Sequence, residues 1–153
     1  MKRSLAAFAQ LCGGRLLGED RPYTAVATDT RGLQPGSLFV ALRGPRFDGN
    51  EFVGAAAAAG AIGAVVDRQI DTAPLPLVEV EDSLAALTRA AAGFRTAFAS
   101  PVVGVAGSNG KTTVKEMTAA ILSRGGPCLA TRGNLNNHIG VPLTLLRLDA
   151  AQV

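Results

Sequence analysis

The sequence predicts an α/β fold, and three observations support this class. Strand-like and helix-like segments alternate along the 153 residues. Aromatic residues make up only 5%, with no Trp and 18 Gly, which favours helices packed closely on a sheet over an aromatic-rich sandwich. The second half reads strand, loop, helix, strand, loop, helix, the order of a parallel α/β domain.

A helix is expected at residues 5–12, followed by two short strands. Apolar residues recur there at helical spacing after Ser4, whose hydroxyl suits an N-cap. Gly13 and Gly14 then end the helix. The stretches GRLLG and TAVATD that follow are both strand-like.

The rest of the first unit alternates in the same way. The apolar run GSLFVAL follows the turn signal Pro35-Gly36 and is expected to be a strand covered on both faces. Asp48 and Glu51 form a capping pattern ahead of the small-residue helix FVGAAAAAG. The strand-like stretches AIGAVVD and PLVEVE complete a small α/β domain that we place at residues 1–81.

The second unit, placed at residues 82–153, begins with the connecting helix DSLAALTRAAAGFRTAF, whose apolar residues share one face. A β-run, VVGVAG, precedes a helix from Lys111 to Arg124. The stretch PCLATRG is another expected strand, GNLNNHIG is a loop, and VPLTLLRL begins a last helix. A doubly wound sheet usually has about five or six strands, so this unit is expected to be the truncated start of a parallel domain.

Composition excludes several classes of function. The net charge is +3 with no Lys/Arg run, so we expect no nucleic-acid partner. No apolar stretch is long enough for membrane insertion, and LAAFA near the N-terminus is too short for a secretory signal. Cys12 and Cys128 lie far apart and are expected to be reduced thiols, so we expect a cytoplasmic protein.

The stretch GVAGSNGKTTVKEM is typical of a phosphate-binding loop. A β-run precedes it, its glycines let backbone N–H groups converge, and the following helix contributes its positive end. The usual spacing, G-x-x-x-x-G-K-[ST], lacks its first glycine here. A glycine-rich turn also occurs between strands and helices that bind no phosphate, but Lys-Thr-Thr at the helix start favours phosphate.

The loop residues receive specific roles. We assign Lys111 to the outer phosphates of a nucleotide and Thr112 to Mg²⁺, which makes them the candidate catalytic residues and Thr112 the candidate metal ligand. Thr113 either contacts phosphate or only begins the helix. Lys115 and Glu116 are expected on a solvated face. The candidate cofactor-binding residues are Gly107, Ser108, Asn109, Gly110, Lys111, Thr112 and Thr113.

Three motifs carry a resemblance to a known family. GSNGKTT followed by VKEM resembles the ATP loop of the Mur ligases, whose loop has the shorter G-x-x-G-K-[ST]-[ST] form. GNLNNHIGVPLTLLRL is similar to those Mur ligases that join D-alanyl-D-alanine to UDP-N-acetylmuramoyl-tripeptide, and TDTRGLQPGSLFVALRGPRFDGNEF to their UDP-sugar-binding domain. Asn50 and His138 depart from the His and the acidic residue that are common in similar proteins.

The resemblance implies a P-loop ATPase domain and an ATP- and Mg²⁺-dependent peptide ligase. ATP would phosphorylate the terminal carboxylate of UDP-N-acetylmuramoyl-tripeptide, and the amine of D-alanyl-D-alanine would attack the acyl phosphate. It also implies an acidic Mg²⁺ ligand on a later strand, a carbamylated lysine and a C-terminal domain. Because 153 residues do not hold these parts, we expect a fragment that is inactive by itself.

Substrate residues are expected in both units. In the first unit the candidates for the UDP-linked substrate are Thr28, Asp29, Thr30 and Arg31. Arg43 and Arg46 lie nearby in sequence, and arginine suits bidentate phosphate binding, although each is also a typical surface charge.

In the second unit Asn134, Asn136 and Asn137 follow an expected strand, where α/β sheets bind ligands. Turn-forming asparagine chemistry is the alternative, and the resemblance favours Asn136 and Asn137 as substrate contacts. His138 is expected to be a surface or packing residue.

Two other interpretations stay open. The chain is either a stand-alone UDP-substrate or nucleotide-binding module without turnover, or a truncated and partly folded product. In the second case apolar faces at Val114, Ile121 and Leu143 would lie uncovered.

Overall fold

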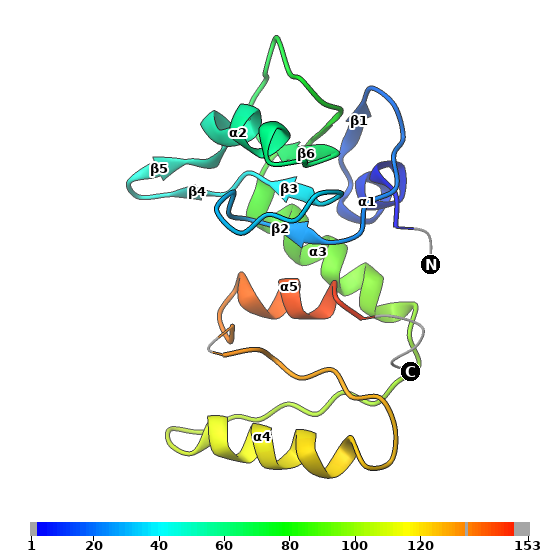
Figure 1. Ribbon diagram of the computed structural model, residues 1–153, viewed down its shortest axis with the longest axis vertical. Coiled ribbons are helices and arrows are strands. Elements are labelled where there is room, and N and C mark those ends of the chain that lie inside the picture. Colours follow the sequence, from blue (N-terminus) through cyan, green and yellow to red (C-terminus); the bar gives the residue numbers. More distant parts are fainter. Residues whose placement is uncertain (1–2, 134, 149–153) are drawn as a thin grey trace.

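The computed structural model describes residues 3–133 and 135–148, and its centre is a five-stranded sheet of order β1-β7-β6-β3-β2 (Figure 1). β1 runs antiparallel to β7, and the other neighbouring pairs are parallel. The strands predicted in the first unit are confirmed, although each is shorter than its apolar run. The sheet strands are β1 (Arg15–Leu17), β2 (Val26–Ala27), β3 (Leu38–Val40), β6 (Gly63–Val66) and β7 (Leu77–Glu79).

The helices begin and end largely where the sequence predicts. Ser4 caps α1 by accepting a hydrogen bond from the amide of Ala7 at 3.3 Å, and Gly13 ends it with φ of 72°. A hairpin of β4 (Arg43–Gly44) and β5 (Phe47–Asp48) leads into the helical segment after β3. The helical elements are α1 (Leu5–Cys12), η1 (Gly49–Phe52), α2 (Val53–Ala58), α3 (Ser83–Thr96), α4 (Lys111–Leu122) and α5 (Gly140–Leu145).

The sheet is covered on both faces, as the apolar run at β3 predicts. Successive strand residues point to opposite faces, so Leu38 and Val40 enter one core and Phe39 enters the other. The first core lies against α1 and α3, and the second lies against α2. A three-layer arrangement therefore holds the sheet at its centre.

Helix α5 packs on α3, although it follows α4 in the sequence (Figure 1). Leu146 and Leu148, just after α5, are buried in the same core as α1 and α3. Arg3 donates a hydrogen bond to the Leu148 carbonyl at 2.5 Å, and its guanidinium lies 5.2 Å from the ring centre of Phe94. Residues from the two halves of the sequence thus share one core.

The strands expected at VVGVAG and PCLATRG are not formed. Both runs are extended, but neither makes a backbone ladder with another strand in the described part of the chain. An apolar run becomes a strand only by pairing, and within residues 3–133 and 135–148 neither run is paired with a strand. The parallel sheet of the structure therefore belongs to the first unit.

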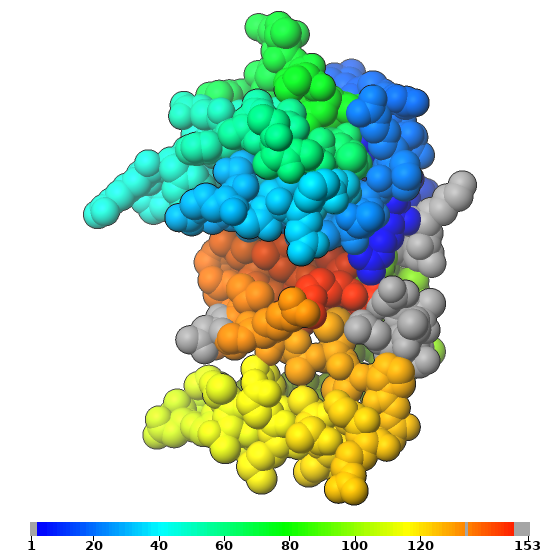
Figure 2. Space-filling view, in the orientation of Figure 1, coloured from blue at the N-terminus to red at the C-terminus, as the bar shows by residue number. Residues whose placement is uncertain are grey.

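Helix α4 lies outside these layers, at the lower end of the view in Figure 2. None of its residues is buried, and Val114 and Ile121 are 50% and 67% exposed. The expectation of an uncovered apolar face is confirmed for these two residues. It is wrong for Leu143, which packs half-buried against the first core.

None of the helices in the described residues has the length and apolar character that a bilayer crossing requires.

Candidate functional site

The predicted phosphate loop joins an extended run to the first turn of α4. Gly107 and Gly110 have φ of 144° and 75°, in the region that favours glycine. Gly110 is the N-cap residue of α4, and no side chain caps this end. The first N–H groups of the helix therefore have neither intrahelical nor capping partners.

Lys111 bends over the loop that precedes it. Its ammonium group donates hydrogen bonds to the carbonyls of Gly107 at 2.6 Å and Ser108 at 3.2 Å. Thr112 and Thr113 follow in the first helical turn and are exposed. A cation, two hydroxyls and the positive end of a 12-residue helix are thus gathered at one place.

The predicted residues Thr28–Arg31 form a turn directly after β2. The Asp29 carboxylate accepts hydrogen bonds from the Arg31 amide at 2.9 Å and from the Arg31 guanidinium at 2.5 to 3.1 Å. These hydrogen bonds from Arg31 hold the pKa of Asp29 at about 2. Asp29 and Arg31 are therefore joined to each other on the surface of the protein.

A second group of polar side chains lies at the same edge of the sheet, after β3 and β6. Because β2, β3 and β6 are parallel, the segments that follow them meet at one edge. Asp67 follows β6 directly, and its side chain is only 9% exposed. It accepts hydrogen bonds from Arg43 Nε at 3.0 Å and from Asn50 Nδ2 at 2.9 Å.

Asp48 extends this group toward the β4–β5 hairpin. It accepts from the amide and the side chain of Asn50 at 2.9 and 2.7 Å, and it pairs with Arg68 at 3.2 Å. Asp48 thus caps η1, as the capping pattern predicts, and these contacts lower its pKa.

Sequence reasoning missed Asp67 as the centre of this group. The available signal was an acidic residue directly after a buried strand, in AIGAVVD. Arg43, for which the sequence left phosphate binding and a surface charge both open, is engaged by Asp67 in the structure.

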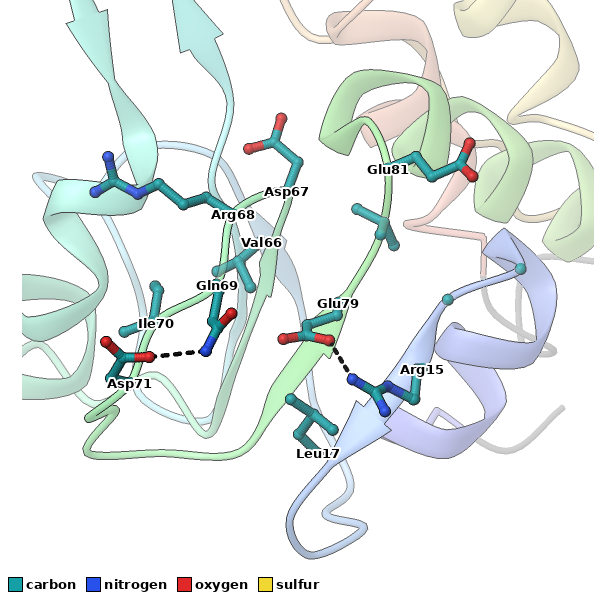
Figure 3. A pocket seen from close by; sticks show the side chains of 13 residues that line it. Arg15, Leu17, Val66, Asp67, Arg68, Gln69, Ile70, Asp71, Glu79 and Glu81 are labelled. Carbon is teal, nitrogen blue, oxygen red and sulfur yellow. Dashed lines mark hydrogen bonds and ion pairs between the residues drawn. The ribbon is translucent and has the colours of Figure 1, made fainter.

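A cavity of about 790 Å³ lies farther along this edge, between the ends of β6 and β7 and the beginning of β1 (Figure 3). Its charged side chains are largely paired, since Arg15 contacts Glu79 at 2.8 Å and Gln69 donates to Asp71 at 2.9 Å. The lining residues do not include Thr28–Arg31.

Asn136 and Asn137 lie before α5. The Asn137 Oδ1 atom accepts hydrogen bonds from the amides of Ile139 at 3.2 Å and Gly140 at 2.8 Å, so this side chain forms the turn that begins the helix. Both asparagines line an apolar groove of about 450 Å³ between α3 and α5, together with His138. Asn134 lies outside the described residues.

The sequence led us to expect Lys115 on a solvated face, and this prediction is wrong. Its side chain is 18% exposed, and its ammonium group donates to the Thr131 carbonyl at 2.6 Å and pairs with Glu116 at 2.8 Å. The periodicity of a single helix did not reveal an acceptor located 16 residues later.

The structure gathers each predicted set but does not join the sets into one pocket. The β4–β5 hairpin, the segment before α5 and the loop before α4 all lie toward the left side of Figure 1, at different heights. The hairpin carries part of the polar group of the first unit. The segment before α5 carries the predicted substrate residues of the second unit, and the loop before α4 carries its predicted nucleotide residues.

Comparisons with known proteins agree with the motifs. A model described as "Mur ligase family, catalytic domain" matches residues 22–95, and one described as "Mur ligase middle domain" matches residues 105–153. A UDP-N-acetylmuramoyl-tripeptide–D-alanyl-D-alanine ligase of Escherichia coli K12 is 50% identical over 145 residues, which are 95% of this chain and 32% of that protein.

Solved structures show the same fold. The crystal structure II of MurF from Acinetobacter baumannii has a TM-score of 0.89 and 37% identity, over 99% of this chain and 34% of that one. MurF ligase from Thermotoga maritima, in complex with ADP, has a TM-score of 0.71 and 32% identity, over 84% of this chain and 30% of that one. The chain thus spans about a third of the length of the relatives it matches.

The two family models match consecutive parts of the sequence in the expected order, and the fold is shared along nearly all of the chain. The chain belongs to the Mur ligase family.

Proposed function

We propose that this chain is the N-terminal part of a cytoplasmic, ATP-dependent ligase that joins D-alanyl-D-alanine to UDP-N-acetylmuramoyl-tripeptide in peptidoglycan synthesis. The observation that carries the proposal is the beginning of α4. It combines two glycines with positive φ, backbone N–H groups without a capping side chain, and Lys111 bent over the loop. The similarity to the Escherichia coli ligase, and the ADP complex of the Thermotoga maritima ligase, support the same assignment.

The residues at this loop fit a nucleotide phosphate. Backbone N–H groups of residues 107–110 and of the first turn of α4 would donate to phosphate oxygens. Lys111 would exchange its two carbonyl acceptors for phosphate oxygens, and Thr112 would offer its hydroxyl to Mg²⁺. When bound, ATP supplies the phosphoryl group that turns an unreactive carboxylate into an acyl group with a good leaving group.

We assign the UDP-linked substrate to the carboxyl edge of the first sheet. Thr28–Arg31 and the hairpin after β3 both lie at this edge, where parallel sheets bind ligands. Asn136 would contact the substrate from the second unit, because its side chain is exposed beside the groove between α3 and α5. Asn137 would orient this segment and contact the substrate with its amide NH₂, since its oxygen caps α5. We keep residues 1–81 and 82–153 as the two proposed domains.

Calorimetric titration of the 153-residue chain with Mg-ATP and Mg-ADP tests the nucleotide assignment. Binding is expected to be lost in Lys111→Met and kept in Arg124→Met, which removes an exposed cation at the other end of α4. Equal affinities in both variants would overturn the role of Lys111.

A second pair of measurements separates the ligase from the alternative. Release of phosphate with tripeptide substrate and D-alanyl-D-alanine is expected to stay at background in this chain and to appear when the remaining two thirds of the protein are present. A chain that binds the UDP-linked substrate but neither ATP nor ADP would instead be a stand-alone UDP-substrate module, and the ligase proposal would fail.

A further inference from the structure

Lys115 is an unusual residue on α4. The helix has no buried residue in the structure, yet the Lys115 side chain is only 18% exposed. A lysine ammonium is strongly hydrated and has three donors, so its withdrawal from water requires acceptors. Two are present, the Thr131 carbonyl at 2.6 Å and the Glu116 carboxylate at 2.8 Å.

The segment that Lys115 contacts has few other restraints. Residues 127–133 form no backbone ladder with another strand in the described part of the chain. On one side Leu129 packs against the core of α1 and α3, and on the other side Lys115 binds the Thr131 carbonyl. In Figure 1 the segment passes between α4 and α5. Lys115 is thus the polar contact that ties it to α4.

Lys115 lies one helical turn after Lys111, and residues four apart share a helix face. Lys111 binds the carbonyls of the phosphate loop, and Lys115 binds the carbonyl of the segment that leads to Asn136 and Asn137. The two ammonium groups therefore connect one helix face to the proposed nucleotide loop and to the proposed substrate segment.

We propose that Lys115 is a positioning residue that fixes segment 127–133, and with it Asn136 and Asn137, against the helix of the phosphate loop. This role rests on the proposed function of the two sites. It differs from that of Lys111, because the ammonium of Lys115 is directed to Thr131 and not to the loop. Nucleotide and substrate would thereby keep one relative placement.

The chain contains its own probe for this segment. Cys128 is half-buried within it, whereas Cys12 is fully buried in the first core. The rate at which a thiol reagent modifies Cys128 therefore reports how firmly the segment is held. Cys12 reports whether the protein remains folded, since it reacts only if the core opens.

The experiment measures thiol modification of the full chain and of three variants, with and without Mg-ADP. Lys115→Met is expected to raise the rate at Cys128 about tenfold, the factor for one lost hydrogen bond from a charged donor. Lys115→Arg should restore the slow rate, because it keeps the charge and the donors. Glu116→Gln removes only an exposed ion pair, keeps a side-chain oxygen as an acceptor and leaves the bond to Thr131, so it should change the rate much less than Lys115→Met.

Nucleotide separates positioning from mere packing. Mg-ADP is expected to slow modification of Cys128 in the wild-type protein and in Lys115→Arg, but not in Lys115→Met, whose affinity for Mg-ADP should stay close to wild type. An unchanged rate at Cys128 in Lys115→Met, or a loss of affinity as large as in Lys111→Met, would overturn the proposal. Absence of Mg-ADP binding in the wild-type chain would refute the proposed function, while the rates without nucleotide still decide whether Lys115 holds the segment.

Discussion

Replacement of Asp67 by Ala should destabilise the first unit by about 1.5–4 kcal/mol. The Asp67 side chain is 9% exposed and accepts hydrogen bonds from Asn50 Nδ2 and Arg43 Nε. The bond from Asn50, which is 4% exposed, joins a buried partner to a charged acceptor and contributes about 1.5–3 kcal/mol. The pair with Arg43 adds about 0–1 kcal/mol, because that guanidinium is half exposed to water.

Thermal unfolding followed by circular dichroism measures this loss. For a chain of this size the expected fall in Tm is roughly 3–16 °C. Asp71→Ala is the matched control, because Asp71 lies in the same loop, is exposed and accepts a single hydrogen bond from Gln69. Its Tm should change little, as is usual for surface sites. Equal Tm values for Asp67→Ala and Asp71→Ala would contradict this reasoning.

Three further predictions concern ionisation and backbone fit. The Asp29 carboxyl should titrate near pH 2 by NMR, because hydrogen bonds from Arg31 hold its pKa at about 2; its contribution to stability is present above pH ~4 and is lost as the pH falls toward 2. Tyr23, the one tyrosine, should ionise near pH 12 by ultraviolet absorbance, because burial raises its pKa to about 12; its contribution is present below pH ~10 and is lost as the pH rises to 12. Gly140→Ala should destabilise by about 1–3 kcal/mol in chemical unfolding, because its Cβ would lie 2.5 Å from the Leu135 Cα.

Each of these predictions has a simple control. In Arg31→Ala the pKa of Asp29 should rise toward its ordinary value of about 4 but stay below it, because the guanidinium is lost while the backbone amide at position 31 still donates. A Tyr23 midpoint near 10 would show that the ring is open to water in the folded protein. Gly126→Ala places a Cβ in open space, so an equal loss of stability at Gly126 and Gly140 would contradict the clash with Leu135.

Local features of the fold were predictable from the sequence. Ser4 begins α1 and Gly13 ends it through contacts within a few residues of each helix end. Asp48 caps η1 in the same way. The buried strand β3 was indicated by an uninterrupted apolar run. Such signals are local, because the partners of each residue lie close to it in the sequence.

The errors all involve partners that are distant in the sequence. VVGVAG has strand composition but pairs with no strand in the described part of the chain, and composition alone does not supply a partner. Asp67 gains its importance from Arg43 and Asn50, which belong to other elements, and Lys115 gains its own from the carbonyl of Thr131. Every residue has a backbone carbonyl, so the amino-acid sequence does not indicate which one accepts the hydrogen bond from Lys115.

The shared core of α1, α3 and α5 has a consequence for synthesis on the ribosome. Leu146 and Leu148 complete a core whose first members are Leu5 and Phe8, and the Leu148 carbonyl accepts a hydrogen bond from Arg3. A nascent chain that has already formed the sheet and the phosphate loop still exposes the part of this core that α5, Leu146 and Leu148 cover. That surface is open to chaperones and proteases until residue 148 has emerged, so the first unit matures only after much of the second has been translated.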